Sequence, residues 1–202
     1  MWIRLSLIGL AALNLLAAQE QLVRLGRPAP ELRVSDVRGN EAMLSEYRGK
    51  SVVVLMAGGE TEGRLAEIRR ESQRRLGKLD TEVVSLTGAK EAATILVDAG
   101  GVVRRVLAGR VLAGGEVVDF VSVWREGKAV FEASCARCHG VDGALDICLD
   151  VKPLVGIGRR YTAAEIREKL RIGELNEEQV MVRGQFYKRA EVEAVLAYIS
   201  GL

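Results

Sequence analysis

The chain has 202 residues, of which 49% are hydrophobic and 28% are charged, a balance typical of a globular protein and not of a disordered one. Its 29 basic and 27 acidic residues leave a net charge of +2, which gives no basis for binding nucleic acid or a strongly anionic surface. Three cysteines and one histidine are the only thiol and imidazole groups available for redox chemistry or metal binding.

Residues 1–18 have the pattern of a secretion signal. Arg4 provides a basic start, the residues up to Ala18 are almost all apolar, and the small side chains at the end offer a cleavage site. The apolar run is too short to span a bilayer comfortably. The alternative is an uncleaved membrane anchor through residues 3–18. Both interpretations predict a protein that is periplasmic or otherwise exported, and the second predicts that it is anchored in the inner membrane.

The segment from Leu25 to Ala113 has the pattern of an α/β domain with a mixed sheet. Its first strong signal is the continuous apolar run Ser51–Met56, as in a strand buried on both faces. A charged helix is predicted to follow over residues 61–76, with Leu65, Ile68 and Leu76 on its apolar side and Gly77 at its end. Further strands are predicted over residues 82–86, 94–98 and 102–107, the last two as a hairpin.

This segment resembles the peroxiredoxin and thiol-disulfide oxidoreductase branch of the thioredoxin-like proteins. The resemblance is carried by Gly26–Leu32 at the opening, by Leu44–Lys50 before the first buried strand, and by Thr94–Gly101 over a later strand and its turn. It implies a thioredoxin-like α/β domain over residues 25–113.

The reactive cysteine of those proteins is missing. Their thiolate lies at a helix N-terminus just after the first buried strand, where the helix dipole lowers its pKa. Here Arg64 stands at that position, and no cysteine precedes Cys135. The proline that the family holds in cis before its third strand is replaced by Glu91–Ala93. We therefore expect a redox-inactive domain that serves for docking or positioning, or that persists as a structural spacer.

A linker is expected over residues 114–123 and a second domain over residues 124–202. This domain contains the motif Cys135-Ala-Arg-Cys138-His139, with the only histidine of the chain. C-x-x-C-H is the attachment signature of c-type haem. Its two thiols form thioethers with the vinyl groups, and the adjacent imidazole reaches the iron. Export suits this motif, because c-type haem is attached outside the cytoplasmic membrane in bacteria.

The second domain resembles a class I cytochrome c over its whole length. Gly127 and Phe131 lie eight and four residues before Cys135, as in the N-terminal helix of that family, and Gly140 and Gly143 follow the motif. The resemblance implies an all-α fold with one covalently bound haem c.

Two further helices complete this resemblance. One is predicted from Thr162 to Leu170, where Thr162 and Glu165 form a capping box. The other is amphipathic over residues 188–199, and its Val195 and Tyr198 are expected to face the glycine and phenylalanine of the N-terminal helix.

Met181 is the expected sixth ligand of the iron, opposite His139. It is the only methionine of the second domain and precedes the last helix, where the family places its distal ligand. A thioether favours ferrous iron and so raises the reduction potential. Val182 stands where the family often has proline, which suggests a less rigid loop and conceivable ligand exchange. An ordinary core methionine is the alternative.

The surroundings of the haem are also indicated by the resemblance. The carbonyl of Pro153 corresponds to the group that accepts the proximal imidazole N–H and fixes the ring. Arg159 and Arg160 are candidate partners of the haem propionates, because arginine suits bidentate pairing with carboxylates. Two solvated surface arginines are the alternative.

Three other readings of the motif remain open. A structural zinc site would use Cys135, Cys138, His139 and Cys148, although adjacent Cys138 and His139 rarely bind one tetrahedral ion together. A dithiol oxidoreductase would expect a buried strand before the motif, whereas a helical stretch precedes it. A haem enzyme or gas sensor would need a labile sixth ligand. Cys148 is otherwise a small buried hydrophobe or the origin of an intermolecular disulfide.

The sequence as a whole predicts an exported mono-haem cytochrome that is not itself an enzyme. It is expected to carry single electrons between protein partners, such as a dehydrogenase, an oxidase or another cytochrome.

Overall fold

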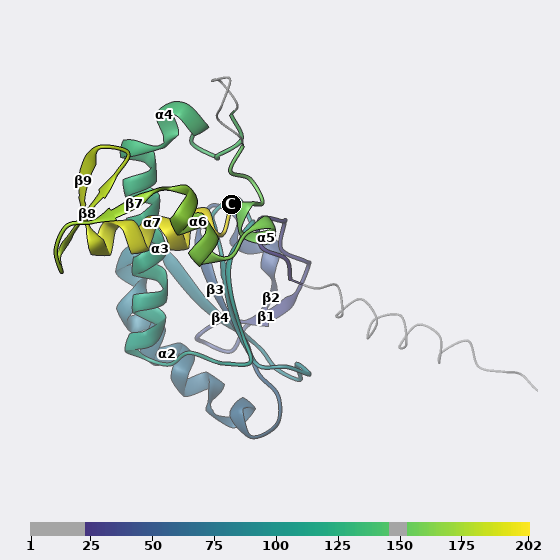
Figure 1. Ribbon diagram of the computed structural model, residues 1–202. Helices are drawn as coiled ribbons and strands as arrows, with labels where there is room; N and C mark the ends of the chain where they lie inside the picture. Colours follow the sequence, from purple (N-terminus) through teal and green to yellow (C-terminus); the bar gives the residue numbers. More distant parts are fainter. Residues whose placement is uncertain (1–22, 146–152) are drawn as a thin grey trace, which may run out of the picture.

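The computed structural model describes residues 23–145 and 153–202, so the expected signal segment and Cys148 lie outside the described residues. Its first part is a mixed sheet of six strands in the order β2-β1-β4-β3-β5-β6 (Figure 1). These strands are β1 (Arg33–Ser35), β2 (Glu41–Met43), β3 (Ser51–Met56), β4 (Thr81–Leu86), β5 (Ala93–Val97) and β6 (Val103–Ala108).

Strand β3 lies inside the sheet because its side chains are apolar on both faces. Its residues Val53, Val54 and Leu55 are fully buried. It pairs in parallel with β4 and antiparallel with β5, and β5 continues antiparallel to β6. The four predicted strands are confirmed to within one residue, as is the thioredoxin-like mixed sheet. Strands β1 and β2 were not predicted.

Helix α2 (Leu65–Leu76) connects β3 to β4 across one face of the sheet. Leu65, Ile68 and Leu76 are buried, as predicted. The start of the predicted helix is instead a 3₁₀ turn over Gly59–Arg64, and the chain continues past Gly77 in another 3₁₀ turn before Asp80 takes a left-handed φ of 49°. The described 3₁₀ turns are η1 (Leu44–Tyr47), η2 (Gly59–Arg64) and η3 (Gly77–Leu79).

Helix α3 (Gly115–Ser134) is continuous through most of the segment expected to be a linker. Val117, Phe120, Val121 and Trp124 recur at helical spacing, and all four are buried. The first half of the helix therefore packs on the same side of the sheet as α2, and its second half leads into the cysteine motif. The residues between 115 and 123 belong to the core and do not form a flexible connection.

Helix α7 (Arg189–Ile199) crosses the second half of α3. A Cβ atom on Gly127 would lie 1.9 Å from the carbonyl oxygen of Ala194, so only glycine permits this approach. The ring of Tyr198 lies 5.2 Å from that of Phe131 and 5.7 Å from that of Trp124, measured between centroids. The predicted terminal helix pair is confirmed.

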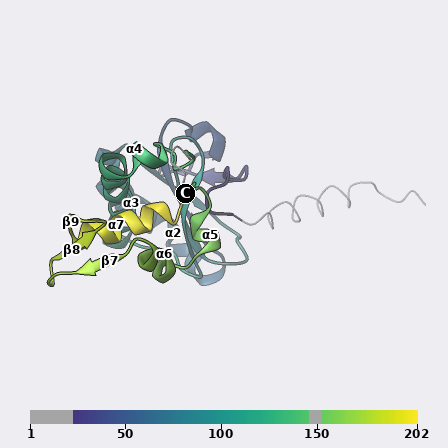
Figure 2. The same cartoon turned by 45° about the horizontal axis from the view of Figure 1, so that its top comes forward.

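The rest of the C-terminal half is only partly helical. Its short helices are α4 (Ala136–His139), α5 (Ile157–Arg160) and α6 (Ala163–Lys169), and α6 begins at the predicted capping box. Between α6 and α7, a three-stranded antiparallel sheet is formed by β7 (Ile172–Glu174), β8 (Gln179–Val182) and β9 (Gln185–Lys188). The cytochrome-like fold is thus confirmed in its helices, but the expected all-α domain also contains this sheet beside α7 (Figure 2).

One hydrophobic core runs through both halves of the molecule. It joins side chains of β3, α2, α3 and α7, and includes Val180 of β8 and the C-terminal Leu202. A second core lies on the opposite face of the six-stranded sheet. Among the helices of the described residues, none combines the length and the apolar character needed to cross a membrane.

Candidate haem-attachment site

The C-x-x-C-H motif forms one helical turn at the end of α3. The amide of Cys135 donates to the carbonyl of Phe131 at 2.7 Å, and the amides of Cys138 and His139 each donate to the carbonyl of Cys135 at 3.1 Å. Because residues three or four positions apart share a helix face, the two thiols and the imidazole lie together. The first thiol is half-buried against the core, and the second is exposed.

Both described cysteines are free thiols. Burial, with a further contribution from Cys138, raises the pKa of the Cys135 thiol above its ordinary value of 9.0. A redox-active dithiol needs the opposite shift, because the thiolate is the nucleophile. Neither of these two cysteines forms a disulfide, so both offer the thiol groups that thioether formation requires.

The zinc alternative also lacks its geometry. Among residues 23–145 and 153–202, no group of three His, Cys, Asp or Glu side chains is placed to hold a metal ion. Cys135, Cys138 and His139 all belong to this range, and only Cys148 lies outside it. The three proposed zinc ligands that the structure describes therefore do not form a metal-binding group by themselves.

Apolar side chains are exposed in the described residues that follow the motif, on either side of residues 146–152. Val141 is 70% exposed, Leu145 is 46% exposed, and Val155 is 40% exposed. The loop is tied to the motif, since the amide of Leu145 donates to the carbonyl of His139 at 2.9 Å. Exposed apolar side chains gathered at one place indicate a binding surface. These residues were not singled out in the sequence, and their apolar side chains are of the kind that contacts a haem macrocycle.

Pro153 and Arg160 meet through a hydrogen bond. The carbonyl of Pro153 accepts from Nη2 of Arg160 at 2.8 Å, and the same nitrogen lies 3.4 Å from the carbonyl of Val155. Arg159 instead lies over Gly156. A Cβ atom added to Gly156 would be 2.6 Å from Nη2 of Arg159. The structure thus brings two predicted residues together at the carbonyl that the sequence assigns to the imidazole of His139. Propionate binding by either arginine stays a prediction.

Met181 lies on β8, the middle strand of the small sheet. Its neighbours Val180 and Val182 pack on the core, so the alternation of a strand directs Met181 to the other face. There it pairs with Gly173, whose Cβ position is 3.8 Å from the methionine Cε, and with Phe186, which is 71% exposed. A proline at position 182 would have no N–H group to donate to a neighbouring strand. Val182, which stands where the family often has proline, is therefore compatible with the sheet. Ligation by Met181 stays a prediction.

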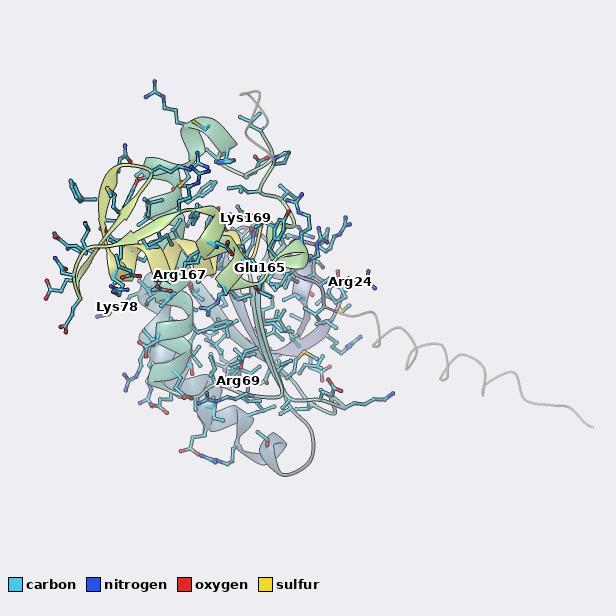
Figure 3. The ribbon with its side chains drawn as sticks, in the orientation of Figure 1. Arg24, Arg69, Lys78, Glu165, Arg167 and Lys169 are labelled. Atoms are coloured by element: carbon cyan, nitrogen blue, oxygen red, sulfur yellow. The ribbon has the colours of Figure 1, made fainter. Side chains whose placement is uncertain are left out.

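Arg64, which the resemblance places where the family has its cysteine, is exposed at the junction of the 3₁₀ turn η2 and α2. The described residues contain no cis peptide bond, and Glu91–Ala93 lead directly into β5. The polar residue missed in the sequence is Arg69, which is buried on α2 and donates to the carbonyl of Ser35 at 3.1 Å and to the hydroxyl of Ser85 (Figure 3). It braces the helix against β1 and β4.

Known proteins match the two halves separately. Residues 124–202 match the family model of cytochrome c. The thioredoxin domain of a thiol-disulfide oxidoreductase from Bacteroides vulgatus is 16% identical, with 50% of this chain and 97% of that chain covered and a TM-score of 0.37. A 2-Cys peroxiredoxin from Plasmodium vivax is 12% identical, with 52% and 98% covered and a TM-score of 0.42.

A domain of a possible thiol-disulfide isomerase from Cytophaga hutchinsonii is 12% identical, with 53% of this chain and 97% of that chain covered and a TM-score of 0.38. Because these similarities are weak, the thioredoxin-like character of the first half rests on the order and direction of its central strands and on the placement of α2. No curated protein of similar sequence matches the chain.

Proposed function

Because residues 124–202 form a cytochrome c domain and the chain is thus a haem-binding redox protein, we propose that it carries single electrons between protein partners. The observation that supports this most directly is the C-x-x-C-H turn at the end of α3, with neither thiol in a disulfide and exposed apolar side chains beside it. Thiol-disulfide exchange by the first half lacks support, since that half contains no cysteine.

Several residues of the chain would hold one haem c, each in a different way. Cys135 and Cys138 would tether it through thioethers, and His139 and Met181 would bind its iron. When bound, the haem supplies one-electron exchange between ferrous and ferric iron. Val141, Leu145 and Val155 would supply apolar contacts to it. Arg160 holds the loop that contains Pro153, and Arg159 is free to approach a propionate.

The sheet position of Met181 favours a carrier over an enzyme or sensor. A labile sixth ligand would be expected on a loop, but β8 has neighbouring strands on both sides. Its backbone is therefore held by two ladders of hydrogen bonds, and Val180 beside it is fully buried. A ligand held in this way exchanges slowly, which suits electron transfer without substrate binding.

We also propose a location for the protein and a redox partner. The protein is exported to the periplasm or an equivalent compartment, with residues 1–18 as a cleaved signal or as a membrane anchor. Its partner is a redox protein, either a dehydrogenase, an oxidase or another cytochrome, that approaches the exposed haem edge. The chain is an electron carrier and not itself an enzyme.

The test is to express the full chain in bacteria with the c-type haem attachment machinery, beside a variant with Cys135→Ala and Cys138→Ala. We expect one haem per chain by the pyridine haemochrome method, retained after denaturation in the wild type and lost in the double variant. Stopped-flow mixing with small inorganic redox agents should show reversible one-electron reduction and oxidation.

Two results would contradict the proposal. A colourless protein that contains stoichiometric zinc would show that the motif binds a metal directly. Ready binding of carbon monoxide to the ferrous protein at neutral pH would show an open sixth position and support an enzyme or a sensor.

A further inference from the structure

Helix α3 belongs to two packing arrangements at once. Val117 and Val121 in its first half are fully buried in the core that contains β3 and α2. Gly127 and Phe131 in its second half are buried against α7. The turn that carries Cys135 follows directly, so the motif extends from a helix whose other end is anchored in the thioredoxin-like half.

Polar contacts fix the first half of α3 in addition to apolar packing. Nη1 of Arg105, on β6, donates to the carbonyl of Phe120 at 2.6 Å. The same guanidinium lies over the ring of Phe120, at 4.2 Å from its centroid. On the other side, the guanidinium of Arg125, at the middle of α3, donates to the carbonyl of Leu79 in η3, the turn that follows α2. The helix is thus bound at its flanks to β6 and to η3.

A second connection joins the two halves at the end of α7. A Cβ atom on Gly201 would lie 1.9 Å from the carbonyl oxygen of Arg104, so the chain touches β6 there. Leu202 is 3% exposed, and its Cδ1 lies 2.8 Å from the Cβ position of Gly143 in the motif loop. The loop beside the motif therefore rests on a residue that itself packs on the thioredoxin-like half.

We propose that the thioredoxin-like half is an intramolecular scaffold that holds the haem-attachment turn folded before haem is bound. A unit of about 80 residues buries a smaller fraction of its surface than a larger domain does, so its stability is more marginal. The contacts of α3 with β6 and α2 supply additional buried surface, and they are made between groups of the chain alone. Loss of the reactive cysteine is compatible with this role, since a scaffold needs the sheet and not the thiol. This inference rests on the proposed function only in treating the motif as an attachment site.

The experiment uses the haem-free full chain, produced without attachment machinery, and amide hydrogen exchange read by mass spectrometry. The test variant is Val121→Asp, which places a charge at a fully buried position 14 residues before Cys135. The control is Ala129→Asp, on the exposed side of the same helix. We expect Val121→Asp to lower protection of residues 127–139 and 189–199 by at least about tenfold, and the control to leave it unchanged.

A milder variant keeps the test decisive if Val121→Asp does not fold. Arg105→Gln removes the contact with Phe120, and Arg33→Gln is its control on an exposed strand position. We expect faster exchange in residues 127–139 for the first variant alone, with a lower yield of attached haem. Unchanged exchange in residues 127–139 and 189–199, despite faster exchange in the sheet, would overturn the scaffold. Failure of wild-type haem attachment would count against the proposed function and leave the exchange result standing.

Discussion

Arg159 and Arg160 are adjacent on α5 but make different contacts, which makes them a matched pair. Only Arg160 donates to the carbonyls of Pro153 and Val155. We expect Arg160→Gln to lower the melting temperature of the haem-free chain by about 2–4 °C, the shift that corresponds to about 1 kcal/mol in a protein of this size. Arg159→Gln removes the same charge without these bonds, so a change within about 1 °C is expected.

Calorimetry on the two variants measures this difference. Equal shifts for both would show that the net charge of α5 matters and that the bond to the Pro153 carbonyl does not.

Met181 can be tested as an iron ligand by spectroscopy. Met181→Ala should abolish the near-infrared methionine-to-iron band of the oxidised haem protein and lower its reduction potential, because a thioether favours ferrous iron. Met43→Ala is the control, since Met43 lies on β2 in the other half. Retention of the band in Met181→Ala would exclude this methionine as the ligand.

At the scale of elements, the crossing of α3 and α7 depends on the absence of one side chain. Gly127→Ala would bring a Cβ atom to 1.9 Å from the Ala194 carbonyl, and backbone on both sides cannot yield easily. We expect a loss of about 3 kcal/mol in the free energy of unfolding, measured in urea. Gly115→Ala, on the same helix with no atom within 4 Å, should be neutral or stabilising by about 0.5 kcal/mol.

A smaller effect for Gly127→Ala than for Gly115→Ala would mean that the two helices do not cross as closely as described.

The capping box of α6 gives a pH-dependent prediction. The amide and hydroxyl of Thr162 donate to Glu165, whose labelled side chain lies at the start of the helix (Figure 3). These bonds hold the pKa of Glu165 below its ordinary value of 4.5. The stabilisation is therefore complete above pH 4.5 and is lost as the pH falls through the lowered pKa.

Thr162→Ala should accordingly cost about 1 kcal/mol at neutral pH and less in acid, whereas Thr162→Ser should retain the cap. Urea unfolding at pH 7 and pH 3 tests this, and an equal cost at both values would contradict it.

At the scale of the whole molecule, the shared core predicts cooperative unfolding. The haem-free chain should unfold in a single transition, with the calorimetric enthalpy equal to the van't Hoff enthalpy. The reason is that α3 cannot leave one half of the core without exposing Trp124, which contacts Tyr198 in the other. Two separate transitions in a calorimetric scan would show that the halves are independent.

The sequence predicted the elements whose apolar pattern is long enough to read. Ser51–Met56 is apolar throughout, and the helix at residues 188–199 has a clear apolar side, so both were found. Strands β1 and β2 have three residues each, which is too short for alternation to be recognised. The extent of α3 was missed although Val117, Val121 and Trp124 carry the helical spacing.

The small sheet was missed for a different reason. Its turn at Arg183 and Gly184 has φ values of 50° and 84°, typical of a two-residue hairpin, but arginine is not the usual residue at its first position. The resemblance to cytochrome c therefore predicts a loop at Met181, whereas this residue lies on β8. The cluster of cysteines and histidine could be found because those residue types are scarce in the chain, whereas the contact of Arg160 with Pro153 depends on a loop geometry that no local pattern encodes.

The unbroken course of α3 also fixes the length of the chain between the two halves. In an α-helix, each added residue turns everything after it by about 100° and advances it by about 1.5 Å. A single insertion after Val121 would leave that residue on the sheet but rotate Gly127 away from α7. Natural variants of this chain should therefore tolerate no change of length in residues 115–127. Another thioredoxin-like domain could replace the first half only if the number of helical residues between its core and Gly127 stayed the same. The stretch that resembles a spacer in the sequence is the one in which the number of residues matters most.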